Sequence, residues 1–174
     1  MLKKIMLFLV CGCFAATVYP AEILNGSFEN GFENWQVKGS ASIDTTESAF
    51  GKSSLKITLE KAVWQRVFQS FSVKPSTTYK LEYYVKCENV VPLADAKFAG
   101  AASWISMKKN TPLRGRQGAW KLDTAPGGWQ MVSYTFKTGP EDTTAAVEFQ
   151  LRNASGTVWF DGVKITEISG TAIK

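Results

Sequence analysis

A two-residue alternation of apolar and polar side chains runs through most of this 174-residue sequence. In the first clear example, Leu55, Ile57 and Leu59 alternate with polar neighbours. Successive side chains of a β-strand point to opposite faces, so this period predicts strands that bury one face. No window shows a convincing helical period. The alternation is found at 53–59, 67–73, 79–86, 132–136, 147–152 and 157–168.

Turn-forming residues separate the alternating segments. Pro, Gly, Asn, Asp and Ser gather there, and these residues preset or tolerate the dihedral angles of tight turns. Roughly nine to eleven short strands in a chain of this length predict an all-β domain, built as a two-sheet antiparallel β-sandwich or a barrel. The turn clusters lie at 74–77, 126–128, 139–142 and 153–156.

The N-terminal residues have the pattern of a secretory signal peptide. Two lysines precede a short apolar run that is too short to span a bilayer comfortably. We therefore expect residues 1–21 to be cleaved and residues 22–174 to form one domain, located outside the cell, in a periplasm or on the cell surface. As an alternative, residues 10–13 resemble a degenerate lipobox, in which Cys13 would become a lipid-anchored N-terminus. No later segment is apolar enough to be transmembrane.

The residue inventory excludes several classes of function. The chain has no histidine, so it has no Ser-His or Cys-His relay and no imidazole metal site. Without the two leader lysines the net charge falls from +5 to about +3, which is too mild to argue for nucleic acid. Cys87 is the only cysteine after residue 21, so we expect it to be a small buried residue rather than half of an internal disulfide.

Five motifs, each weak by itself, occur in one order along the chain. They lie at 25–35 (NGSFENGFENW), 49–55 (AFGKSSL), 69–81 (QSFSVKPSTTYKL), 128–136 (GWQMVSYTF) and 156–163 (GTVWFDGV). Together they resemble the carbohydrate-binding modules of families four, nine and twenty-two, which are galactose-binding-domain-like jelly rolls. The resemblance covers residues 23–168 and implies a jelly roll that binds a glycan without catalysis. Many domains of this shape have no known ligand, so a structural or adhesion domain that binds a protein partner stays open as the alternative.

The resemblance also implies one structural calcium ion between the beginning and the end of the fold. It assigns Glu29 and Asp161 as carboxylate ligands and adds backbone carbonyl groups of the loop from Ser48 to Ser53. Calcium takes about six to eight oxygen ligands and tolerates irregular geometry, which suits such a mixture. The alternative is that Asp161 accepts backbone N–H bonds at a β-bulge and that Glu29 is solvated. Glu33, in the second Phe-Glu-Asn, has no counterpart in the motif, and we expect it to be solvated.

Alternation along the strands also selects side chains that point away from the core. We expect the strands at 79–86, 98–107 and 145–152 to share one sheet of the jelly roll. Their outward side chains then offer aromatic faces for the C–H faces of sugar rings and planar polar groups for sugar hydroxyls. The predicted sugar-binding set is Tyr84, Glu82, Trp104, Glu148, Gln150 and Arg152.

Other aromatic residues are assigned secondary roles. Trp120 lies in the long irregular stretch 88–128 and is predicted either to form a groove wall or to plug the sheet. A second outward group, Trp64, Arg66 and Phe68, is predicted to lie on the other sheet. Three tryptophans at family motifs are predicted to serve packing: Trp35, Trp129 and Trp159.

The simplest interpretation of these residues is a non-catalytic monomer that binds a polysaccharide or oligosaccharide. Glu82 and Glu148 are the pair that a glycosidase would need, but paired carboxylates on a flat sheet more often bind hydroxyl groups. A basic segment adds the hypothesis of an acidic glycan, against the simpler interpretation of a solvated charged loop. Its residues are Lys108, Lys109, Arg114, Arg116 and Lys121.

Overall fold

The part of the chain that the computed structural model describes forms ten β-strands and no helix, so the predicted all-β fold is confirmed. No helix in this part is long and apolar enough to cross a membrane. The predicted leader up to residue 20 and the basic segment 108–116 lie outside it. Only the backbone is described for Trp64 and for 117–121. The described residues are 21–61, 64–96, 99–107, 117–121 and 128–168.

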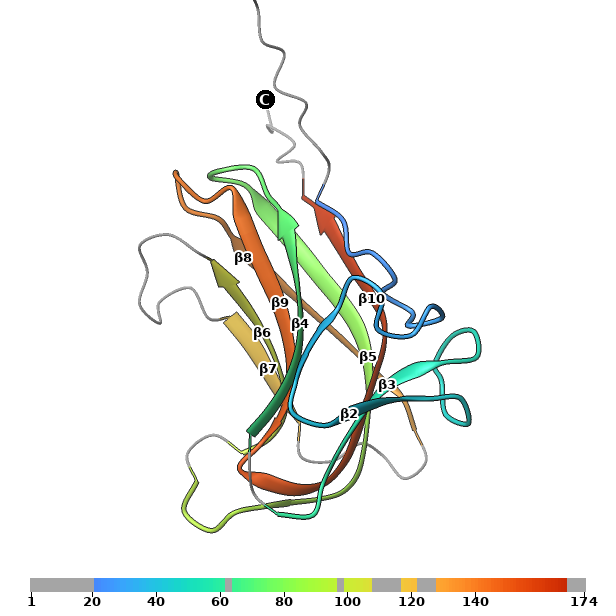
Figure 1. Ribbon diagram of the computed structural model, residues 1–174. Coiled ribbons are helices and arrows are strands. Elements are labelled where there is room, and N and C mark those ends of the chain that lie inside the picture. Colours follow the sequence, from blue (N-terminus) through green and yellow to red (C-terminus); the bar gives the residue numbers. More distant parts are fainter. Residues whose placement is uncertain (1–20, 62–63, 97–98, 108–116, 122–127, 169–174) are drawn as a thin grey trace, which may run out of the picture.

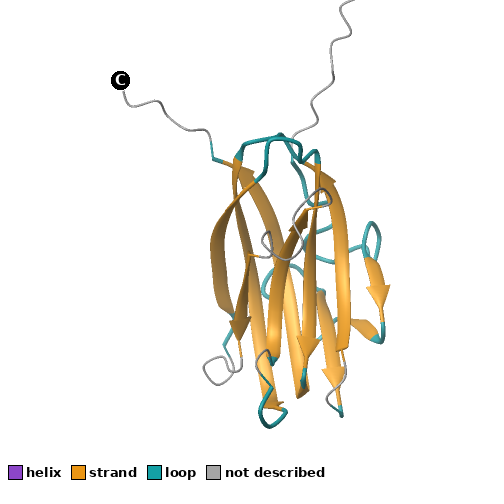
Figure 2. Ribbon diagram, turned by 90° about the vertical axis from the view of Figure 1, so that its left-hand side faces the viewer, coloured by secondary structure: helices purple, strands orange, loops and turns teal. Residues whose placement is uncertain are grey.

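Two five-stranded antiparallel sheets pack face to face as a β-sandwich (Figure 1). The strands of both sheets run in nearly the same direction (Figure 2), as in aligned sandwiches. Sheet 1 contains, in spatial order, β1 (Gln36–Lys38), β4 (Trp64–Ser72), β9 (Thr144–Arg152), β6 (Gly100–Met107) and β7 (Gln117–Lys121). Sheet 2 contains β2 (Ala41–Asp44), β3 (Ser54–Leu59), β10 (Ala154–Glu167), β5 (Thr78–Pro92) and β8 (Gln130–Lys137).

Large aromatic side chains from both sheets meet in the centre of the sandwich. The ring centroid of Phe149 in sheet 1 lies 4.5 Å from that of Phe160 and 5.0 Å from that of Tyr83, both in sheet 2. All three side chains are buried, and full burial of one such side chain contributes about 1.5–3 kcal/mol. Cys87 is buried beside this core, as predicted. Apolar burial at the alternating inward positions therefore holds the two sheets together.

A buried polar bridge crosses the same core. The Tyr83 hydroxyl donates to Ser103 Oγ of sheet 1 over 2.7 Å, and this oxygen is 3.2 Å from the Tyr134 hydroxyl. Burial raises the pKa of Tyr83 well above its usual range, and it raises the pKa of Tyr134 to about 12. Both phenols therefore stay protonated and satisfy each other through one serine, as buried polar groups require.

The N-terminal turns are organised by one asparagine. The Asn25 side-chain amide donates to the carbonyl groups of Gly31 and Glu33 over 3.0 and 3.1 Å. The Asn25 carbonyl accepts the indole N–H of Trp35 over 3.0 Å. The Trp35 ring packs 4.9 Å from Phe28, and both are buried, so the packing role predicted for Trp35 is confirmed.

The outer face of sheet 2 carries a network around Trp159, which is buried as predicted. The ammonium groups of Lys56 and Lys86 lie 5.2 and 5.1 Å from the centroid of its ring. Asp44 accepts hydrogen bonds of 2.9 Å from the indole N–H and from Lys56. Burial acts to raise the pKa of Asp44, but hydrogen bonds from Thr46, Trp159 and Lys56 outweigh it and hold the pKa well below its usual value. This carboxylate is therefore a stability element of the sandwich.

Candidate functional site

The outer face of sheet 1 brings together most of the residues predicted to contact sugar. In the strand register, Glu148 on β9 pairs with Phe68 on β4 and with Trp104 on β6. Two positions along β9, Gln150 pairs with Arg66 on β4. Cross-strand partners share a face and have Cβ atoms about 4.5–5.5 Å apart. These five residues therefore form one continuous surface, which we call the platform.

Glu148 is held in place from both neighbouring strands. Its Oε2 lies 3.0 Å from Nη1 of Arg66, and its Oε1 accepts a hydrogen bond of 3.2 Å from the Ser106 hydroxyl. The Arg66 guanidinium also lies 5.0 Å from the centroid of the Phe68 ring. Only 6% of Glu148 is exposed, so this carboxylate has little freedom to rotate. The centre of the platform is thus a fixed arrangement of polar groups rather than a set of mobile surface charges.

The remaining predicted residues of this face lie along the same strands. Gln150 is only 2% exposed, although alternation places it outside the core. Trp104 is half-buried, and its register partner on β7 is Gly118, which has no side chain. Arg152 is also half-buried and ends β9. Trp120 pairs with Ala102 through the backbone, but its side chain is outside the described part of the structure.

Two residues of the predicted sugar-binding set lie on the opposite face of the molecule. Tyr84 and Glu82 lie on β5, which is in sheet 2, so the prediction that this strand shares a sheet with β6 and β9 is wrong. Because consecutive strands alternate between the sheets here, β5 and β6 lie in different sheets. Tyr84 packs edge-on against Phe50 at 4.8 Å between ring centroids, and Glu82 forms an ion pair of 2.9 Å with Lys80. Neither residue can share a groove with Trp104.

The group predicted for the other sheet is the one that completes the platform. Strand β4, with Trp64, Arg66 and Phe68, pairs directly with β9 in sheet 1. The prediction that these residues lie on the other sheet is therefore wrong. Arg66 and Phe68 take the places that Glu82 and Tyr84 were expected to fill.

A second cluster, which contains the predicted calcium ligands Glu29 and Asp161, joins the first turns of the chain to its last strand. Asp161 Oδ2 accepts backbone N–H bonds of 2.8 Å from Ala49 and from Phe50. Glu29 Oε1 accepts backbone N–H bonds of 2.9 Å from Lys52 and from Ser53. The pairing of β10 with β5 shifts register just after Asp161, so the alternative of a carboxylate that accepts N–H bonds at a bulge describes this geometry. The loop that contains Ser48 and Ser53 thus receives both carboxylates.

Burial and the closeness of the two carboxylates both disfavour the ionised form of Asp161. Asp161 is 0% exposed, and burial raises its pKa, with a smaller contribution from the nearby charge of Glu29, against the lowering effect of its backbone hydrogen bonds. Gly51 has a φ angle of +66°, in the left-handed region, and an added Cβ would lie 2.5 Å from Glu29 Oε1. Glycine is therefore required for the loop to close around Glu29. Among the described residues, no group of three or more His, Cys, Asp or Glu gathers as a metal cluster.

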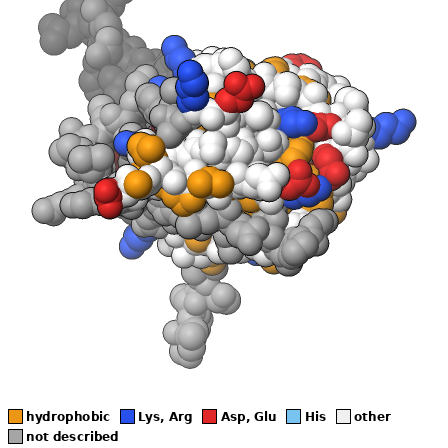
Figure 3. All heavy atoms as spheres, turned by 90° about the horizontal axis from the view of Figure 1, so that it is seen from below, with side chains coloured by type: hydrophobic (Ala, Val, Ile, Leu, Met, Phe, Trp, Pro, Cys, Tyr) orange, Lys and Arg blue, Asp and Glu red, His pale blue; other side chains and the backbone are white. Residues whose placement is uncertain are grey.

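Exposed apolar side chains also gather at the end of the sandwich that Figure 3 shows from below. Val91 and Leu93, at the end of β5 and in the following turn, are 60% and 53% exposed. Charged side chains lie among the apolar ones on this side of the molecule (Figure 3). A few exposed apolar residues are normal on a protein surface, so the platform remains the main candidate site.

Comparison with known proteins identifies the family. The sequence model of the carbohydrate binding domain family, types 4 and 9, matches residues 21–156. The chain belongs to this family. The predicted resemblance is confirmed.

A curated relative of this carbohydrate binding domain is part of a larger enzyme. Endo-1,4-beta-xylanase A of Thermotoga maritima is 27% identical over 171 residues, which cover 89% of this chain and 15% of the xylanase. The carbohydrate binding domain therefore spans only a small part of that relative's length. The similarity concerns that part of the xylanase alone and says nothing about catalysis.

Solved structures of carbohydrate-binding modules have the same fold. A family 16 module is 19% identical with a TM-score of 0.64, and the match covers 83% of this chain and 99% of that one. TmCBM61, solved with beta-1,4-galactotriose, is 14% identical with a TM-score of 0.62 over 84% and 97%. The CBM22-1 xylan-binding domain of Xyn10C from Paenibacillus barcinonensis is 17% identical with a TM-score of 0.59 over 84% and 94%. At these identities the likeness shows the fold, and the predicted two-sheet jelly roll is confirmed.

Sequence reasoning missed the role of three residues in this carbohydrate binding domain. Arg66 and Phe68 were assigned to the wrong sheet, and Ser106, which donates to Glu148, was not among the predicted site residues. The alternation signal for Arg66 and Phe68 was present, because both are outward residues of one strand. Only the pairing of β4 with β9 could have placed them beside Glu148.

Proposed function

We propose that this carbohydrate binding domain holds its glycan on the platform of sheet 1, without catalysis. The observation that carries the proposal is the cross-strand row of Phe68, Glu148 and Trp104, with Glu148 fixed by Arg66. Aromatic rings pack on the apolar C–H faces of sugar rings, and fixed carboxylate and guanidinium groups pair with sugar hydroxyls. A polar group that is already in position loses little entropy when a ligand binds, so more of its interaction with the sugar appears as affinity.

The carboxylate inventory of this face supports the non-catalytic part of the proposal. Hydrolysis of a glycosidic bond needs two carboxyl groups, at about 5–10 Å from each other across the bond. Glu148 is the only acidic residue in the strands of sheet 1. Glu82, its predicted counterpart, lies on the strand β5 of sheet 2. We expect no release of reducing ends from a polysaccharide panel, and clear release would contradict the proposal.

The names of the relatives suggest which glycans to test first. One relative is a xylanase, one similar structure is a xylan-binding domain and one was solved with beta-1,4-galactotriose. We therefore propose a β-1,4-linked polysaccharide as the ligand class. Calorimetric titration with xylohexaose, cellohexaose and β-1,4-galactotriose tests this. Binding of at least one of them is the expected result, and binding of none would contradict the ligand class.

We also propose that the loop at 48–53 holds a structural calcium ion together with Glu29 and Asp161. The donor chemistry supports this: among the described residues Glu29 Oε2 accepts no hydrogen bond, and calcium takes carboxylate and carbonyl oxygens together. Burial raises the pKa of Asp161, and the nearby charge of Glu29 adds a smaller contribution, so a cation here would stabilise the ionised carboxylate. Such an ion would tie the first turns to β10. Calorimetry with calcium on chelated protein tests the proposal, and absence of heat with an unchanged melting temperature would contradict it.

We propose further that the protein acts outside the cytoplasm. The support is the leader pattern of residues 1–21, with two lysines before a short apolar run. Mass spectrometry of the protein exported from a bacterial host tests this. A chain that begins near residue 22 is expected, and a mass that includes lipid on Cys13 would select the alternative. A full-length chain retained in the cytoplasm would contradict both.

A further inference from the structure

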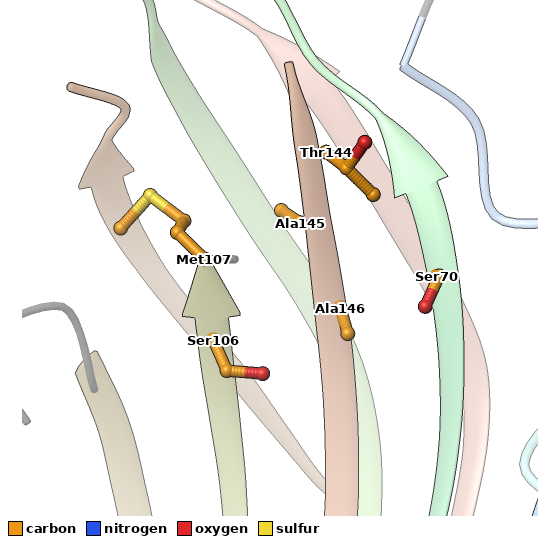
Figure 4. A pocket seen from close by; sticks show the side chains of 6 residues that line it. All are labelled: Ser70, Ser106, Met107, Thr144, Ala145 and Ala146. Atoms are coloured by element: carbon orange, nitrogen blue, oxygen red, sulfur yellow. The ribbon is translucent and has the colours of Figure 1, made fainter. Parts of the chain in front are cut away.

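A hollow lies on the outer face of sheet 1, beside the platform (Figure 4). Ala146 on β9 pairs with Ser70 on β4 and with Ser106 on β6, one row along from Glu148. The side chains of this row are much smaller than those of the neighbouring row with Phe68 and Trp104, so the surface is hollowed there. The hollow has a volume of about 200 Å³ and is lined by Ser70, Ser106, Met107, Thr144, Ala145 and Ala146.

The lining offers hydroxyl groups and apolar contacts but no charge. Figure 4 shows the hydroxyls of Ser70 and Ser106 on either side of the Ala146 methyl group, with Thr144 above and Met107 at the far edge. Among the described residues, the hydroxyls of Ser70 and Thr144 have no hydrogen-bond partner. The Ser106 hydroxyl donates to Glu148, which leaves its oxygen able to accept a hydrogen bond from a ligand.

The dimensions limit the occupant to one small ring. The hollow spans three neighbouring strands, which is about 10 Å from β4 to β6. Its volume lies below the range of about 300–1,000 Å³ that pockets for drug-sized ligands have. An oligosaccharide could not be enclosed, but a single pyranose ring could lie over Ala146 with its hydroxyl groups toward the serines. The Trp104 row is adjacent, so the next rings of the same chain would lie on the platform.

We propose that this hollow is a subsite for one neutral pyranose ring of the glycan that the platform binds. This inference rests on the proposed function. The three hydroxyls pair with sugar hydroxyls, while Ala146 and Met107 contact C–H groups of the ring. Because the described lining contains no cationic side chain, nothing in it would compensate the charge of a uronate. The subsite therefore selects a neutral sugar at one end of the bound segment.

Two substitutions that fill the hollow test the subsite. Ser70→Val adds bulk at an exposed strand position, where a β-branched residue suits the backbone. Ala146→Leu fills the floor. Ser133→Val is the matched control, because Ser133 is also an exposed strand serine but lies on β8 of sheet 2. Melting temperatures of all three are compared with that of the unmodified protein, and Ser70→Val carries the test if Ala146→Leu does not fold.

The readout is calorimetric affinity for xylohexaose, cellohexaose and β-1,4-galactotriose. For the sugar that binds, the two filling variants are expected to lose about tenfold in affinity, while Ser133→Val keeps it. Unchanged affinity in folded Ser70→Val would overturn the subsite, and the proposed function would stand if Trp104→Ala still abolishes binding. If the unmodified protein binds none of the three sugars, both the subsite and the proposed ligand class are overturned.

Discussion

Arg66 and Glu148 form an ion pair of 3.0 Å between β4 and β9, at the centre of the outer face of sheet 1. The pair joins a strand near the beginning of the domain to one near its end. It also fixes the carboxylate of Glu148, which lies between Phe68 and Trp104 in the strand register, and the guanidinium of Arg66, 5.0 Å from the centroid of the Phe68 ring. In the proposed binding mode, stability and sugar recognition therefore depend on the same contact.

Glu148→Gln is expected to weaken both properties. The amide still accepts the Ser106 hydroxyl, but Arg66 loses its charged partner, and hydrogen bonds to charged groups contribute about 1.5–3 kcal/mol. We expect urea unfolding to show a loss of stability of about 1–2 kcal/mol and calorimetry to show weaker sugar binding. Full stability with full affinity would show that the ion pair fixes nothing that the glycan uses.

Asp44 is expected to make the free energy of unfolding depend on pH in the acidic range. Its pKa in the folded protein is depressed, because hydrogen bonds from Thr46, Trp159 and Lys56 outweigh the opposing effect of burial. A depressed carboxyl pKa contributes stability above the unfolded value of about 3.9, and this contribution is lost as pH falls below it.

Asp44→Asn is therefore expected to lower the free energy of unfolding by about 1–3 kcal/mol at pH 7 and by much less at pH 2–3. Urea titrations of both proteins at the two pH values measure this difference. Asp95→Asn is the control, because the Asp95 side chain is exposed and forms no hydrogen bond or ion pair with a described residue. An equal loss at both pH values for Asp44→Asn would contradict the assignment.

The two Phe-Glu-Asn turns near the N-terminus are expected to respond differently to substitution. Glu29 reaches the loop at 48–53 through Oε1, whereas Glu33 is exposed and makes no side-chain hydrogen bond to a described residue. Glu29→Ala should abolish any calcium-dependent rise in melting temperature, and Glu33→Ala should keep it. Thermal unfolding with calcium and with a chelator measures both, and equal behaviour of the two variants would remove Glu29 from the proposed site.

Much of the fold could be predicted from alternation alone. The period of two places Phe149 and Tyr83 inward and Trp104 and Glu148 outward, and the structure agrees at each of these positions. Alternation is a local property of one strand, so it carries to the structure wherever a strand has one buried face. Gln69 also lies inward as its position predicts, because its amide bonds both backbone groups of Leu24 over 2.8 and 2.9 Å.

The neighbours of each strand could not be predicted in the same way. Tyr84 and Phe68 are both outward aromatic residues of alternating strands, and nothing within either strand says which one lies beside Glu148. The pairing of β4 with β9, two strands far apart in the sequence, decides which aromatic residue lies beside Glu148. This pairing depends on how the connections cross between the sheets. The burial of Gln150, at an outward position of β9, is likewise not visible in the alternation of that strand alone.

The most direct test compares Trp104→Ala with Tyr84→Ala. Both residues are half-buried aromatics that point out of their sheets, but Trp104 lies on sheet 1 and Tyr84 on sheet 2. Affinity electrophoresis in xylan, β-glucan and galactan, with calorimetry on the matching oligosaccharides, measures binding by each variant. The account predicts that Trp104→Ala loses affinity by about tenfold or more and that Tyr84→Ala binds like the unmodified protein. Unchanged binding by Trp104→Ala, or loss of binding by folded Tyr84→Ala alone, would contradict it.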